Sequence, residues 1–171
     1  MSLKAMRKWI SLAIAIVLYY IVHEGAHLVV ALLFGTFQSI HIANWGLGVQ
    51  IVANTGAMSD MQIFWFCIMG VIATLIVGYI LVGQRKNISK IPSDFVKAIL
   101  YYATIIFLFL DPFYLSIAYR FVGGGDFNGI VLIGIPEMAV FIFFSTLFVL
   151  HLFIFLKLVY PAYKQGFMKK V

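Results

Sequence analysis

Two histidines and a glutamate stand together near the start of the chain, in the run His23-Glu24-Gly25-Ala26-His27. On a helix, residues four positions apart share one face, so the imidazoles of His23 and His27 can converge on one metal ion. Zinc binds neutral imidazoles, and a hydrolytic zinc site adds one further protein ligand and keeps a position for water. Glu24 is then placed to act as the general base toward that water. The spacing by itself is therefore compatible with a metal-binding pair and an adjacent base.

The segment around these residues is apolar, as is most of the chain. Of the 171 residues, 64% are hydrophobic and 11% are charged, whereas soluble domains are about half apolar and a quarter charged. A soluble fold of this size cannot bury so much apolar surface, so the composition predicts an integral membrane protein. Ionisable side chains within an apolar helix are costly unless they are paired or ligated, and they are therefore candidates for function.

Four apolar segments are each long enough to form a transmembrane helix: residues 9–35, 62–83, 97–120 and 130–160. A spanning helix needs roughly 20 apolar residues, and backbone groups in hydrocarbon must be satisfied within the segment. Residues 36–61 partly alternate polar with β-branched side chains and contain a glycine-rich turn near Trp45–Gly48, which predicts a β-hairpin. We expect an all-α membrane protein with about four transmembrane helices, a membrane-associated hairpin and a single domain over residues 1–171.

Basic residues gather at the ends of the apolar segments. They occur before the first segment, in the connection 84–96 and after the fourth segment. The positive-inside rule then puts these parts, with both termini, on the cytoplasmic side of a multi-pass protein in the lipid bilayer. This distribution argues against a nucleic-acid partner, which would require a basic patch or stripe. It leaves the oligomeric state open.

Further residues extend the pattern of the first motif. Leu28 follows the second histidine, Phe34-Gly35 ends the segment, the predicted hairpin contains Gly46-Leu47-Gly48, and a small-residue stretch occupies Met69–Ala73. Together these features resemble the site-2 protease family of intramembrane zinc metalloproteases, of which this chain would be a small, minimal member or relative. The resemblance implies a membrane-associated hairpin after the motif helix, a Zn²⁺ cofactor, and cleavage of a transmembrane peptide or protein substrate.

The third zinc ligand is expected to be a carboxylate. Asp126 lies in a glycine-flanked break after the third apolar segment, which resembles the position of the family's ligating Asp, and the resemblance implies that Asp126 joins His23 and His27. Asp111 stays open as the alternative ligand or as a partner of a ligating histidine, because it precedes Pro112 at about the depth of the histidines. Glu137 also qualifies by type, but its place after Pro136 is typical of a helix start.

Two alternatives to an intramembrane protease remain open. A membrane metal-binding protein or transporter could use the same ligands, and it would need further histidines and acids along the second and fourth segments, where they are sparse. A protease-like scaffold that does not cleave would have no need for Glu24. We therefore favour peptide-bond hydrolysis by water that Glu24 activates, with an extended substrate paired to an edge of the hairpin.

Overall fold

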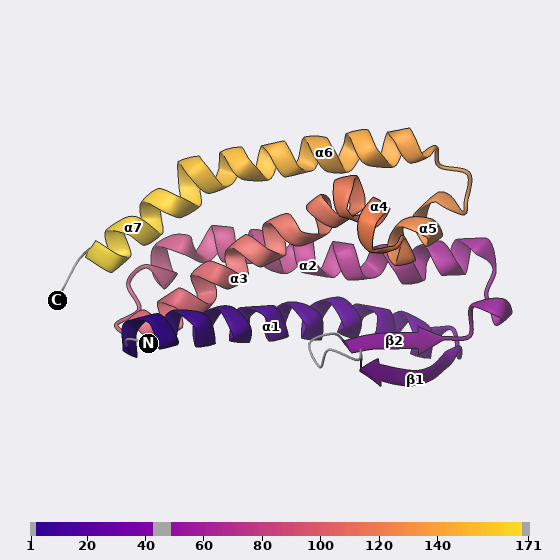
Figure 1. The fold of residues 1–171 in the computed structure, drawn as a ribbon, viewed down its shortest axis with the longest axis horizontal. Coiled ribbons are helices and arrows are strands. Elements are labelled where there is room, and N and C mark those ends of the chain that lie inside the picture. The colour runs from indigo at the N-terminus through magenta and orange to yellow at the C-terminus, as the bar shows by residue number, and fades with distance from the viewer. Residues whose placement is uncertain (1–2, 43–48, 169–171) are drawn as a thin grey trace.

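The computed structural model of the chain describes residues 3–42 and 49–168, which form a bundle of long helices with one β-hairpin (Figure 1). The helices are α1 (Leu3–Leu33), α2 (Asp60–Ile88), α3 (Asp94–Phe113), α4 (Tyr119–Val122), α5 (Gly125–Val131), α6 (Glu137–Ile154) and α7 (Tyr160–Met168). The strands are β1 (Phe37–Ile42) and β2 (Val49–Ala53). π-Helical turns join α3 to α4 and α6 to α7. The expected fold class is confirmed, including the position of the hairpin between the first two long helices.

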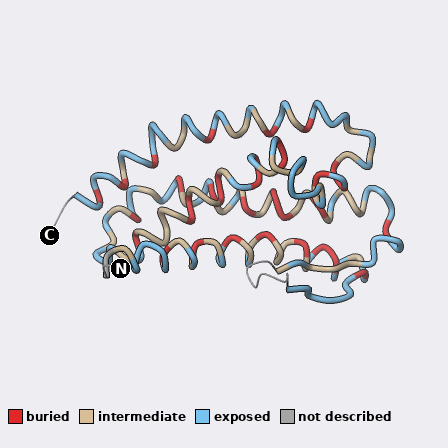
Figure 2. The backbone as a smooth tube through the Cα atoms, in the orientation of Figure 1, coloured by how far each residue is buried: buried red, intermediate tan, exposed pale blue. Residues whose placement is uncertain are grey.

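Four helical stretches are long and apolar enough to cross a membrane: Ala5–Leu33, Asp60–Ile88, Asp94–Val122 and Glu137–Met168. Many residues along them are exposed, as the pale blue of Figure 2 shows. Large apolar residues are among them, and Trp9 and Phe153 are 64% and 61% exposed. A helix that is apolar on its outer as well as its inner face suits a lipid environment better than water.

The second long helix begins where its sequence provides a cap. The Ser59 hydroxyl accepts a hydrogen bond from the backbone N–H of Gln62, and the Gln62 side chain accepts one from the backbone N–H of Ser59. This reciprocal pair satisfies two amides that lack helical partners. The helix then continues to Ile88 rather than 83. The predicted connection 84–96 is therefore mostly helical, with residues 89–93 between α2 and α3.

The predicted fourth segment, 130–160, is wrong at its start. Gly134 has a φ of +88°, a left-handed conformation that interrupts a helix, and Pro136 precedes α6 as its N-cap. The last long helix consequently begins at Glu137, which occupies the helix start that the sequence predicts for it. Residues Gly125–Val131 instead form the separate short helix α5.

The hairpin lies against α1, with β2 nearer to the helices and β1 outside it (Figure 1). The strands are antiparallel, and Ile40 pairs with Ile51 and His41 with Gln50. All residues of β1 are exposed, whereas most of β2 is partly buried. The predicted turn near Trp45–Gly48 lies outside the described residues. One edge of β2 pairs with β1, and its other edge faces the helices.

The short helix α5 folds back onto α2 through small and apolar residues. The chain leaves α4 through Gly123, whose φ of +98° favours glycine. On α5, Gly129 lies so close to α2 that a Cβ there would overlap Cys67 Sγ. Phe127 and Ile130 of α5 join the same buried cluster as Cys67. This packing carries Asp126, in the first turn of α5, toward α1.

Candidate metal centre

The imidazoles of His23 and His27 face the carboxylate of Asp126. His23 Nε2 lies 3.1 Å from Asp126 Oδ2, and His27 Nε2 lies 3.6 Å from Asp126 Oδ1. One ligand atom from each residue lies within 4.8 Å of the others, and no other such group of three occurs within residues 3–42 and 49–168. The histidines are buried and Asp126 is partly buried. The structure thus brings together the three residues that the sequence and the resemblance single out.

The spacing of these atoms suits a small divalent ion. Nitrogen and oxygen atoms bound at roughly 2.0–2.2 Å around a tetrahedral zinc lie about 3.3 Å from one another. The two separations from Asp126, 3.1 and 3.6 Å, bracket that value. Two neutral imidazoles and one carboxylate are also a donor set that zinc accepts in hydrolytic sites. The three side chains therefore fit a small divalent ion such as zinc.

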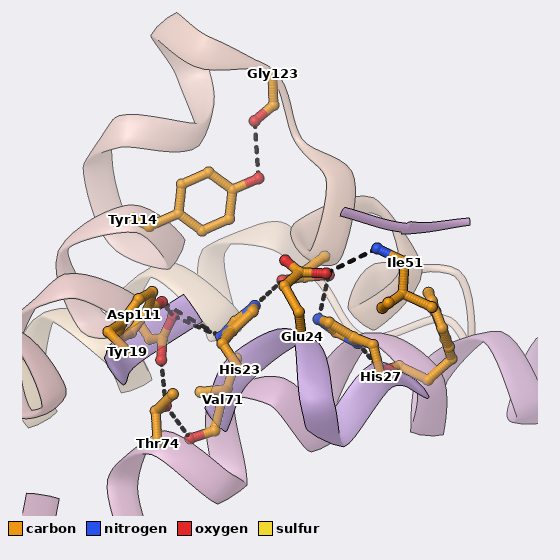
Figure 3. Close-up of polar contacts among 12 residues, drawn as sticks. Tyr19, His23, Glu24, His27, Ile51, Val71, Thr74, Asp111, Tyr114 and Gly123 are labelled. Carbon is orange, nitrogen blue, oxygen red and sulfur yellow. Dashed lines mark hydrogen bonds and ion pairs between the residues drawn. The ribbon is translucent and has the colours of Figure 1, made fainter. Parts of the chain in front are cut away.

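The other nitrogen of His23 meets a buried polar cluster (Figure 3). Its Nδ1 lies 3.4 Å from Asp111 Oδ1 and 3.3 Å from the Tyr19 hydroxyl. Asp111, which is 1% exposed, also accepts hydrogen bonds from the hydroxyls of Tyr19 and Thr74. These contacts come from α1, α2 and α3, so they fix the ring of His23 with Nε2 toward Asp126. Asp111 therefore occupies the place of a partner to a histidine rather than that of a third ligand.

The ring of His27 is held by the backbone of α2. Its Nδ1 donates a hydrogen bond of 2.6 Å to the carbonyl oxygen of Phe66. A carbonyl can only accept, so the proton of the neutral ring lies on Nδ1 and leaves Nε2 free to bind a metal. Such a partner on the far nitrogen sets both the tautomer and the orientation of a ligating imidazole. Both histidines thus direct Nε2 to the same point.

Gly70 of α2 lets the backbone approach these rings closely. A Cβ at this position would lie 2.7 Å from His27 Nε2 and 2.9 Å from His23 Nε2. Any side chain at residue 70 would therefore enter the space in which the ring nitrogens converge. The small-residue stretch Met69–Ala73 thus has a structural role at this one position, where α2 closes the back of the site.

Glu24 lies beside the two histidines on the side of the hairpin (Figure 3). Its Oε2 accepts a hydrogen bond of 2.9 Å from the backbone N–H of Ile51 in β2. One cleft of about 700 Å³ is lined by Glu24, by residues Gln50–Ala53 and by the three candidate ligands His23, His27 and Asp126, which we call the metal group. The carboxylate that the sequence predicts as a base is therefore oriented by β2 and borders the same space as the three candidate ligands.

The charge state of Asp126 also suits a ligand. Burial alone would raise the pKa of this carboxyl group, but when the rings of His23 and His27 are protonated, their hydrogen bonds and charges outweigh that effect and lower the pKa to about 2. A metal displaces protons from its ligands. A carboxyl group that is already ionised at neutral pH has no proton to release when it binds a metal.

The remaining histidines and Glu137 lie away from the centre. His41 is exposed on β1, His151 is buried between the Tyr79 hydroxyl and the carbonyl of Leu108, and Glu137 is exposed at the start of α6. The sequence reasoning assigned no role to Tyr19 and Thr74, which hold Asp111. Tyr19 could have been found, because it precedes His23 by four residues and shares its helix face. No local signal indicates Thr74.

Comparison of the chain with models of protein families, with curated proteins and with solved structures finds no match.

Proposed function

We propose that this chain is an integral, multi-pass membrane zinc metalloprotease, similar to the site-2 protease family, that cleaves a membrane-embedded peptide or protein. The observation that carries the proposal is the convergence of His23 Nε2, His27 Nε2 and the Asp126 carboxylate beside Glu24 in one cleft. These residues sit on helices that are long and apolar enough to cross a membrane, or next to them. A purely structural zinc site is closed by four protein ligands, whereas this group has three.

In this proposal His23, His27 and Asp126 hold the metal. A zinc ion there would act as a Lewis acid toward water and the scissile carbonyl. Glu24 accepts a proton from water and returns it to the leaving amine, which is general acid–base work worth about 10²–10⁴ in rate. The Ile51 N–H holds one oxygen of Glu24 at 2.9 Å, so the carboxylate keeps its orientation during proton transfer.

The edge of β2 that does not pair with β1 supports a binding mode for an extended substrate. The Ile51 N–H points to Glu24 and not to β1, which shows that this edge faces the cleft. A peptide aligned with it would form main-chain hydrogen bonds without a demand for a particular sequence. It would also lie next to Glu24 and Asp126, because residues Gln50–Ala53 line the same cleft.

A second, apolar groove supports a route for the substrate. It measures about 480 Å³ and runs along α1 from Trp9 to Leu28, with Val49 and Ile51 on its border. Tyr20, Glu24 and Ile51 line both this groove and the cleft of the metal group. We place the apolar part of a transmembrane substrate in this groove, since the groove shares these three lining residues, the candidate base Glu24 among them, with the cleft of the metal group.

The proposal is tested with the full chain reconstituted in vesicles with a pool of single-span membrane peptides. We expect one zinc per chain and peptide products that mass spectrometry detects. Glu24→Gln should keep the zinc and lose the products, and His23→Ala should lose both. Zinc binding without products would favour the non-cleaving scaffold. Zinc flux into the vesicles that depends on His23 would favour the transporter.

A further inference from the structure

A basic pocket lies at the end of the bundle where both termini are drawn in Figure 1, away from the metal group. It measures about 960 Å³ and is formed by the end of α2, the connection 89–93, the start of α3, the α6–α7 junction and α7. Its lining contains one acid, Asp94, and five basic side chains: Arg85, Lys86, Lys90, Lys97 and Lys157. The pocket therefore carries a strong excess of positive charge.

One of these cations, Lys97, is bonded within the lining of the pocket. Lys97 is 5% exposed, and its ammonium group donates to the carbonyl oxygen of Gly166 at 2.8 Å and pairs with Asp94 at 2.9 Å. Gly166 also packs tightly on the connection 89–93, because a Cβ there would lie 2.7 Å from the Ser89 carbonyl oxygen. These contacts join the start of α3 and the connection 89–93 to α7 along one wall of the pocket.

The other four cations are available to a ligand. In the part of the chain that the structure describes, Lys97 with Asp94 is the only ion pair in this lining. Lys86, Lys90 and Lys157 are exposed, and Arg85 is partly buried with one N–H on the carbonyl oxygen of Val82. An anion with several oxygen atoms could contact several of these groups at once, as phosphate does.

The position of the cations matches the head-group level of a membrane. Arg85 and Lys86 lie in the last turn of α2. Lys157 follows Glu137, the start of the last long helix, by about 30 Å at ~1.5 Å per residue, which equals the hydrocarbon thickness. The lining also includes apolar side chains, among them Ile91, Leu158 and Phe167. Basic and apolar walls together suit a molecule that has both an anionic head and a hydrocarbon tail.

We propose that this pocket binds the phosphate-bearing head group of an anionic phospholipid, with the acyl chains against Ile91, Leu158 and Phe167. Basic pockets between membrane helices are known to suit such head groups. A soluble phosphate ester would use the same cations but would leave the apolar wall without a partner, and this difference favours the lipid. The inference rests on the membrane placement proposed above and is independent of proteolysis.

The test measures lipid binding to the purified full chain by native mass spectrometry, with no cleavage assay. Phosphatidylglycerol is titrated against phosphatidylcholine, and glycerol 3-phosphate serves as the soluble phosphate. We expect at least a tenfold preference for phosphatidylglycerol over phosphatidylcholine. The double variant Lys90→Gln/Lys157→Gln should weaken phosphatidylglycerol binding roughly 25-fold, or about fivefold for each charge removed near the head groups.

The matched control is Lys8→Gln/Lys164→Gln, which removes two exposed lysines outside the pocket. It should change phosphatidylglycerol binding by no more than about twofold. An equal loss in both double variants would mean a general charge effect and would overturn the proposal. Absence of a preference in the wild type, or glycerol 3-phosphate bound as tightly as the lipid, would overturn it as well. All four lysines are exposed, so the variants should keep the melting temperature of the wild type.

Discussion

The carboxylate of Asp111 lies 3.4 Å from Nδ1 of His23, whereas Asp126 approaches the Nε2 of the same ring. The two aspartates thus occupy opposite ends of one imidazole. One is placed to bind a metal together with that ring, and the other to hold the ring in position. This division separates the two residues between which the sequence left the third ligand open, and it leads to different expectations for their variants.

Asp126→Ala is expected to abolish stoichiometric zinc binding. It removes the carboxylate that faces both histidines in the described part of the chain. Zinc at 100 times its Kd should stabilise the wild type by about 2.7 kcal/mol, and it should leave the melting temperature of the variant unchanged. Metal analysis and thermal unfolding check both statements. One tightly bound zinc in Asp126→Ala would contradict the assignment.

Asp111→Asn is expected to keep the zinc but to weaken its binding roughly 10- to 100-fold, which is the usual effect of losing a partner behind a ligating histidine. The amide retains the shape of the side chain but removes the charge beside His23 Nδ1. Competition with a zinc-binding dye measures the Kd. The control is Asp60→Asn, which removes an exposed charge at the start of α2 outside the cleft. Equal Kd values for the two variants would refute the role of Asp111.

Gly70→Ala is expected to weaken zinc binding and to destabilise the fold by about 1–3 kcal/mol, because the new methyl group would overlap the ring nitrogens of both histidines. Gly83→Ala in the same helix is the matched control. A Cβ at Gly83 has no atom within 4 Å, so this change should be neutral or stabilising by up to about 1 kcal/mol through helix propensity. The zinc Kd and the melting temperature are measured for both. A neutral Gly70→Ala would mean that α2 does not close the site as described.

Ala13→Phe is expected to impair cleavage of membrane peptides and to leave zinc content unchanged. Ala13 is exposed in the apolar groove along α1, well before the metal group in the chain. A phenyl ring there would occupy the proposed route and should raise KM about tenfold, or ~1.4 kcal/mol. The control is Leu18→Phe, which adds a ring to the same helix at an exposed position outside the groove lining. Normal KM for Ala13→Phe would exclude the groove as the route.

N-methylation of a peptide substrate tests pairing with the edge of β2. A methyl group on an amide that donates to β2 removes one main-chain hydrogen bond, worth about 1 kcal/mol, and should lower kcat/KM roughly fivefold. Methylation of the next amide should have little effect, because successive N–H groups of a strand point to opposite sides. The two peptides are compared by their product formation rates. Equal sensitivity at neighbouring positions would argue against an extended, strand-paired substrate.

The class of fold and part of the site follow from local features of the sequence. Runs of apolar residues specify helices without reference to distant parts of the chain, since backbone groups in hydrocarbon must be satisfied within each segment. The pairing of His23 with His27 was also readable, because helical spacing alone puts them on one face. The predicted start of the fourth long helix was wrong, although its cause is also local in sequence. Gly134 and Pro136 interrupt an otherwise apolar run.

Which of the two aspartates faces both histidines depends on contacts between helices that are distant in sequence. His23 and Asp126 are 103 residues apart in sequence, and their contact depends on the left-handed turn at Gly123 and the packing of Gly129 on Cys67. Asp111 lies at the depth of His23, as the residue count predicts, but Tyr19 and Thr74 hold it at the other nitrogen of that ring. Helical periodicity fixes the neighbours of a residue on its own helix, whereas contacts across helices depend on how α1, α2, α3 and α5 pack together.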